Sequence, residues 1–123
     1  AGGGGIPVME QGSHLKGASA VIEKDRAAGL LAKELDADVL MFITGVPNVV
    51  LNYGSDHPIN IDKMTTADAA RYAEEGHFKT GSMLPKVESS IDFINAGKGR
   101  RAIITSLDGA KSALAGKGGT TIQ

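Results

Sequence analysis

The chain has 123 residues, enough for one domain with its own core, and 41% of them are hydrophobic while only 4% are aromatic. Its formal net charge of -1 argues against a basic nucleic-acid surface, and the lack of cysteine excludes disulfides and thiolate metal sites. No run approaches the ~20 apolar residues of a membrane helix and no signal peptide opens the chain, so we expect a soluble, cytoplasmic protein that binds neither membranes nor nucleic acid.

The first predicted elements are two short strands and a helix. Residues 6–10 read as a strand, 11–14 as a turn and 18–22 as a second strand. Residues 25–35 have helical spacing, and their expected apolar face consists of Ala28, Leu31, Ala32 and Leu35. The small alanines on that face predict a helix that lies close to a sheet.

A buried parallel strand is predicted next. Residues 39–43 form a continuous apolar run that ends before Thr44-Gly45, which is typical of a strand covered on both faces. A short strand is expected at residues 49–51. The polar stretch 52–63 contains a glycine and a proline and reads as a loop.

Two helices follow this loop. The first spans residues 66–75 and ends at Gly76. Ser82 is expected to cap the second helix, which tolerates Pro85 because first-turn N–H groups lack partners within the helix. The second helix ends at Gly97, and its expected apolar stripe is Met83, Val87, Ile91 and Ile94.

The remaining residues complete an α/β pattern. Residues 102–104 read as a strand, Ser106 is expected to cap a helix that runs to Leu114, and a turn at 116–119 leads to a strand at 120–122. Strands that alternate with helices predict a three-layer α/β/α sandwich with a mainly parallel sheet. We see no linker, so residues 1–123 are expected to form one unit.

Three segments suit a bound anion. Residues 81–82 open a helix whose first turn carries Lys86, and N–H groups at a helix start attract negative charge. A second helix opens on Lys24-Asp25, and the glycine run 2–5 has the freedom to approach a phosphate closely. Each has an ordinary alternative: a surface lysine, a solvated helix start or a flexible end. Together they favour a phosphate-handling site.

These segments resemble the carbamate kinase family, in the same order along the chain. The most specific match is Gly81-Ser82-Met83-Leu84-Pro85-Lys86-Val87-Glu88. The others are Gly2 to Val8, Val21 to Asp25, Gly76 to Phe78, Arg101 to Leu107 and Gly116 to Thr120. The resemblance implies the C-terminal, nucleotide-binding half of an amino-acid kinase fold, with the N-terminal half absent.

The resemblance also implies an activity. Carbamate kinases transfer a phosphoryl group reversibly between carbamoyl phosphate and ADP, giving ATP and carbamate, in arginine metabolism. We therefore expect ATP or ADP as the nucleotide, with Mg²⁺ held mainly by the nucleotide phosphates, and a homodimer of the full-length protein. The chain alone would lack half of the site and is expected to be inactive by itself.

Site residues follow from the resemblance by position. Lys24 would contact the nucleotide phosphates, Asp25 would orient the lysines, and Lys86 would neutralise the transferred phosphoryl group. Thr44, Gly45, Val46, Val50 and Met83 would lie against the nucleotide, whereas the acceptor phosphate would meet the backbone of Gly2, Gly3, Gly4 and Gly5. No metal-ligating residues are expected on the chain, since His14, His57 and His77 have no ligand spacing.

The chain departs from the family pattern at the nucleotide segment. An acidic residue is absent at Gly45, a tyrosine is absent at Val50, and Ser55-Asp56 replaces a lysine-proline pair. These differences leave two alternatives open. One is a related kinase that forms another acylphosphate, and the other is a nucleotide-binding module without catalysis.

Overall fold

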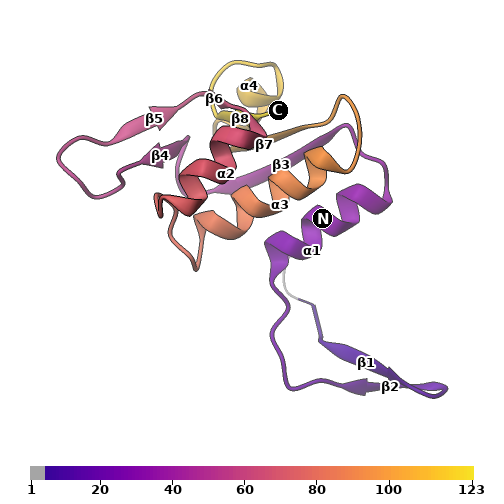
Figure 1. The fold of residues 1–123 in the computed structure, drawn as a ribbon. Helices are drawn as coiled ribbons and strands as arrows, with labels where there is room; N and C mark the ends of the chain where they lie inside the picture. The colour runs from indigo at the N-terminus through magenta and orange to yellow at the C-terminus, as the bar shows by residue number, and fades with distance from the viewer. Residues whose placement is uncertain (1–4) are drawn as a thin grey trace.

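The computed structural model describes residues 5–123 (Figure 1). Its elements, in chain order, are β1 (Val8–Gln11), β2 (His14–Gly17), α1 (Lys24–Glu34), β3 (Val39–Thr44), β4 (Val49–Leu51), β5 (Ile59–Ile61), β6 (Lys63–Met64), α2 (Thr66–Glu74), α3 (Met83–Asn95), β7 (Arg101–Ser106), α4 (Ala110–Leu114) and β8 (Thr120–Ile122). None of the helices in this part of the chain is both long and apolar enough to cross a membrane.

A mainly parallel sheet forms the middle layer. Its order is β3-β7-β8-β6, with β3 parallel to β7, β6 parallel to β8, and β7 antiparallel to β8. Ala102 and Ile104 of β7 join the core on the face covered by α1 and α3, whereas the alternate residue Thr105 lies beside Ala113 of α4. Helices therefore cover both faces of β7, and the predicted α/β fold with a mainly parallel sheet is confirmed.

Helix α3 supplies the centre of the core. Its Phe93 and Val87 are fully buried, together with Ile104 and Ile122 of the sheet. The predicted stripe was only partly right, because Met83, Ile91 and Ile94 are half-buried at the margin while Phe93 takes the centre. The fully buried Phe93 is therefore the largest α3 side chain in this core.

The buried face of α1 differs from the predicted one. Ala32 is buried and Ala28 half-buried, but Leu31 and Leu35 are 41% and 70% exposed. Gly29 instead faces α3, where a Cβ in its place would lie 3.1 Å from the Cβ of Ser89. The buried face of α1 is therefore the one with its smallest residues, because these let α1 and α3 pack closely.

Two strand predictions were wrong. Residues 18–22 form no strand: the chain turns at Gly12, which has a φ of 62°, and β2 pairs directly with β1 across that turn. The 52–63 segment is not all loop, because β5 pairs antiparallel with β4 and β6 joins the sheet. In both places the strands are set by pairing partners, which short polar segments do not reveal on their own.

The expected cap at Ser106 is also absent. Helix α4 begins later, at Ala110, and no side chain caps it. The hydroxyl of Ser106 accepts a hydrogen bond from the N–H of Gly109 (3.3 Å) and so stabilises the turn before the helix. The predicted bounds of α1, α2 and α3 agree closely with the structure, and Gly76, whose φ is 78°, ends the α2 segment. The strands predicted at 6–10 and 102–104 lie instead at 8–11 and 101–106.

A capping box at the start of α2 allows a test of pH dependence. Thr65 Oγ1 accepts from the N–H of Asp68 (3.1 Å), while Asp68 Oδ2 accepts from the N–H and the hydroxyl of Thr65 (3.3 and 2.7 Å). These hydrogen bonds, with a smaller contribution from Arg71, hold the pKa of the Asp68 carboxyl below its ordinary value. Because the folded pKa is lowered, the stabilisation is present at neutral pH and is lost as the pH falls through that pKa.

We therefore expect Asp68→Asn to lower the melting temperature more at pH 7 than at about pH 2, because the wild-type carboxyl loses its charge as the pH falls through its lowered pKa. Circular dichroism melts at the two pH values measure this difference. Glu74→Gln, on the exposed surface of the same helix, is the control. If Asp68→Asn lowers the melting temperature equally at both pH values, the charge of the Asp68 carboxylate does not stabilise the capping box.

Candidate functional site

A buried ion pair joins the starts of two helices. Lys86 Nζ donates to Asp25 Oδ2 at 2.8 Å, and the two side chains are only 9% and 7% exposed. Lys24 Nζ lies 3.6 Å from the same Asp25 oxygen and 3.9 Å from Glu23 Oε1, and the Lys24 side chain is 56% exposed. One carboxylate therefore holds a buried lysine and lies beside an accessible one.

Helix packing brings these residues together. Asp25 lies in the first turn of α1, whose start is capped by Glu23 accepting from the N–H of Arg26 (2.8 Å). Lys86 lies in the first turn of α3. The close contact of Gly29 with Ser89, one turn further along each helix, keeps the two helix starts side by side. Asp25 and Lys86 thus meet although they are 61 residues apart in the sequence.

Burial changes the interpretation of Lys86. The alternative of an ordinary surface lysine is wrong, since its ammonium is enclosed and donates to two oxygens, Asp25 Oδ2 and the carbonyl of Ser82 (3.2 Å). Burying an ammonium is costly unless it is paired and hydrogen-bonded. A lysine fixed in this way is a preorganised positive charge, which is what stabilisation of a transferring phosphoryl group needs.

The N-terminus of α3 is closed by the chain itself. The carbonyl of Lys79 accepts hydrogen bonds from the N–H groups of Ser82, Met83 and Leu84, at 3.2, 3.1 and 3.1 Å. Pro85 has no N–H to offer. Ser82 occupies the N-cap position as predicted, but its side chain makes no capping hydrogen bond. The N–H groups that the sequence offered as an anion site are occupied in this conformation.

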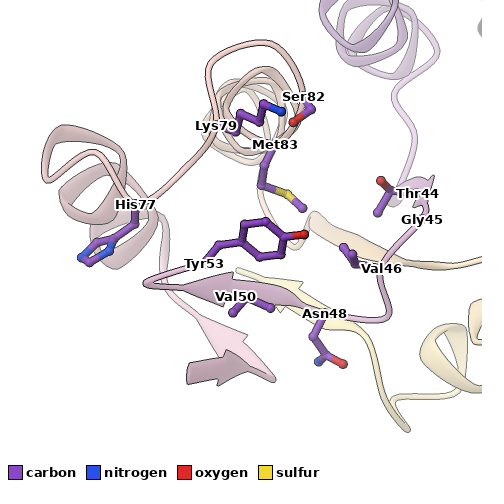
Figure 2. Close-up of a pocket in the computed structure, with 10 residues that line it drawn as sticks. All are labelled: Thr44, Gly45, Val46, Asn48, Val50, Tyr53, His77, Lys79, Ser82 and Met83. Carbon is purple, nitrogen blue, oxygen red and sulfur yellow. The ribbon is translucent and has the colours of Figure 1, made fainter. Parts of the chain in front are cut away.

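A cleft of about 300 Å³ opens beside this helix start (Figure 2). It contains five of the predicted nucleotide-binding residues, namely Thr44, Gly45, Val46, Val50 and Met83. Its other lining residues are Asn48, Tyr53, His77, Lys79 and Ser82. Of these, the sequence singled out only Ser82, as part of the helix start that suits an anion. The cleft therefore unites the end of β3, strand β4 and the start of α3.

The position of the cleft agrees with the topology. Thr44 is the last residue of β3, and Gly45 and Val46 follow it at the carboxyl end of the strand, the edge at which open parallel sheets bind ligands. Met83 points into the cleft from above and Tyr53 crosses it from the side in Figure 2. Val46 and Val50 add apolar surface, so this part of the cleft suits a flat, largely apolar ring.

Two of the unpredicted residues have structural partners already. Asn48 Nδ2 donates to the carbonyl of Gly119 (2.9 Å), the carbonyl of Ile61 and Asp62 Oδ1 (both 3.2 Å), which ties β4 to neighbouring turns. The ring of His77 lies 3.2 Å from Glu75 Oε2 and edge-on to Tyr72. His77 lies within the matched segment Gly76 to Phe78, and Lys79 lies between that segment and the one that begins at Gly81. This position was the only available signal for the two residues.

The cleft and the lysine pair adjoin through Ser82. This residue lines the cleft, and its carbonyl accepts from Lys86 Nζ. Of the predicted phosphate loop, Gly2, Gly3 and Gly4 lie outside the described residues. Gly5 is described and lies beside Ile22, where a Cβ would be 3.5 Å from Ile22 Cγ1, just before the start of α1.

Comparisons with known proteins agree with this arrangement. A family model described as the amino acid kinase family matches residues 2–106. The carbamate kinase-like protein YqeA of Escherichia coli is 50% identical over 98% of this chain, and a carbamate kinase of Thermococcus kodakarensis is 49% identical over the same share. These matches confirm the resemblance found in the sequence.

The fold of the chain is also similar to that of a solved carbamate kinase structure. The carbamate kinase of Giardia lamblia bound to AMP-PNP superimposes on 96% of this chain with a TM-score of 0.90 and 42% identity. The chain covers only 37% of that protein, and 39% and 38% of the two curated relatives. It therefore spans about two fifths of the length of the proteins that it matches.

Proposed function

This chain belongs to the amino acid kinase family, and from that premise we propose that it is the nucleotide-binding part of a carbamate kinase. In the proposed reaction an oxygen of the ADP β-phosphate attacks the phosphorus of carbamoyl phosphate. The bond from phosphorus to the carbamate oxygen breaks, and ATP and carbamate are released. The reverse reaction uses the same groups.

The observation that carries this proposal is the Lys24–Asp25–Lys86 group beside the cleft. Lys86, paired to Asp25 at 2.8 Å, would neutralise charge on the transferred phosphoryl group. Lys24 is accessible and would contact the nucleotide phosphates. Asp25 would touch no substrate and would position both lysines. Phosphoryl transfer needs mainly positioning and electrostatic stabilisation, which these residues can supply.

The nucleotide would occupy the cleft next to this group. Val46, Val50 and Met83 would pack against the base, with Thr44 and Gly45 at the carboxyl end of β3. A ligand placed there would extend its phosphates past Ser82 toward Lys86. The backbone of Gly2 to Gly5 would meet the acceptor phosphate, and Gly5 lies close to the start of α1.

Mg²⁺ would be held mainly by the nucleotide phosphates. The described residues bring no three His, Asp or Glu side chains together as a metal site, and Asp25 is already paired with lysine. When bound, Mg²⁺ would offset negative charge on the phosphate oxygens. We further propose that residues 1–123 act as the C-terminal half of a cytoplasmic homodimeric enzyme of arginine metabolism.

The test is formation of ATP from carbamoyl phosphate and ADP by the full protein. We expect turnover that disappears when carbamoyl phosphate is omitted. A related kinase with another acceptor is the second candidate, because Gly45 and Val50 depart from the family pattern and both line the cleft. A panel of acylphosphates distinguishes the two. Binding of ADP with no transfer from any of them would contradict both and indicate a non-catalytic module.

A further inference from the structure

Lys79 is a positively charged residue that lines the cleft itself, separate from the three residues proposed to act in the reaction. It lines the cleft together with Ser82 and Met83. In Figure 2 its side chain runs along the upper wall and its amine end points toward Ser82. The residue lies in the loop between α2 and α3, and the sequence alone suggested no role for it.

The backbone of Lys79 is held firmly in place. Its carbonyl accepts the three N–H groups that begin α3, which fixes the point from which the side chain leaves. The same hydrogen bonds remove those N–H groups as partners for an anion. A phosphate at this wall of the cleft would therefore need a positive side chain, and Lys79 is the lysine that lines it.

The charges around the cleft leave Lys79 available. None of the cleft-lining residues named above is acidic. His77, the other basic residue, already lies against Glu75. Lys79 makes no ion pair with any residue between 5 and 123. A ligand that enters the cleft thus meets one uncommitted ammonium group and no repelling carboxylate.

We infer that Lys79 binds the phosphate nearest the ribose of a nucleotide in the cleft and so selects nucleotides over nucleosides. This inference rests on the proposed nucleotide site. The ring-binding surface is formed by Val46, Val50 and Met83, and Lys86 lies beyond the Ser82 carbonyl. A phosphate chain between these two places passes Lys79 first and reaches Lys86 last.

The experiment compares adenosine, AMP and ADP binding to the full protein by titration calorimetry, with wild type and Lys79→Gln. We expect Lys79→Gln to weaken the binding of AMP and of ADP by the same factor, about tenfold, which corresponds to the loss of one charge-assisted hydrogen bond. The affinity for adenosine should not change. Lys98→Gln, an exposed lysine in the turn after α3, should change none of the three. A higher salt concentration should reduce the difference in AMP and ADP affinity between the wild type and Lys79→Gln, because salt screens the charge of the lysine.

Other outcomes overturn the inference. If Lys79→Gln weakens adenosine binding as much as AMP binding, Lys79 acts on the shape of the cleft. If it weakens only ADP binding, the lysine contacts the outer phosphate. Unchanged AMP affinity, or a wild type that binds AMP no better than adenosine, would also overturn it. The proposed reaction fails separately: if ADP binds but carbamoyl phosphate yields no ATP, the affinity ratios still decide the role of Lys79.

Discussion

Replacing Lys86 by alanine is expected to lower the rate of ATP formation by about 10²–10³-fold, the loss seen when one preorganised donor to a transition-state charge is removed. The reason is the fixed position of the ammonium group, which donates hydrogen bonds to Asp25 and to the Ser82 carbonyl. Lys86 as a whole residue is only 7% exposed. Water cannot replace a charge fixed in this way without reorganising. Steady-state kinetics with carbamoyl phosphate and ADP measure the effect.

Two further variants separate the charge from packing. Lys86→Met keeps most of the side-chain volume and removes the ammonium group with its hydrogen bonds to Asp25 and Ser82, so it should be as slow as Lys86→Ala while leaving a smaller cavity. Lys98→Ala, at an exposed position, should retain full activity. Near-normal turnover of Lys86→Met, with the circular dichroism spectrum unchanged, would contradict the role proposed for this lysine.

Replacing Asp25 by alanine is expected to destabilise the fold by about 3–5 kcal/mol, because it leaves the buried Lys86 ammonium without its anion. Asp25 is 5% exposed, and the Lys86 side chain has no other acidic partner among residues 5–123. Turnover should fall as well, since Lys86 loses the group that positions it. Urea unfolding followed by circular dichroism measures the stability, with Asp92→Ala on the exposed surface of α3 as control.

A double variant makes this prediction sharper. If the pair is coupled, Asp25→Ala combined with Lys86→Met should be less destabilised than the sum of the two single variants, because no unpaired buried charge remains. Strict additivity would show that the two side chains do not depend on each other in the folded protein. The double variant should remain inactive in either case, since it lacks the proposed catalytic lysine.

Much of the fold follows from local sequence. The apolar run 39–43 predicted β3, Gly76 marked the end of α2, and residues 120–122 formed the last strand as expected. Such signals are local because a continuous apolar run or a left-handed glycine constrains its own segment. The resemblance to carbamate kinases likewise needed only the ordered segments around Lys24 and Lys86.

Pairing and packing between distant segments required the tertiary structure. Strand β5 exists because β4 lies beside it, and residues 18–22 are not a strand because β1 pairs with β2. On α1 the exposed Leu31 contradicts simple periodicity, because close approach to α3 favours the smaller Gly29 at the contact. Propensity and spacing describe one segment, whereas burial depends on what another segment presents to it.

The same division holds for the candidate site. The sequence, through its resemblance to carbamate kinases, named Lys24, Asp25 and Lys86 as candidate site residues, together with five residues that line the cleft. Only the tertiary structure brought Lys86 within 2.8 Å of Asp25, buried both, closed the start of α3 with the Lys79 carbonyl and placed Lys79 at the cleft. A charge acquires a fixed position and a dry surrounding only when distant segments pack around it.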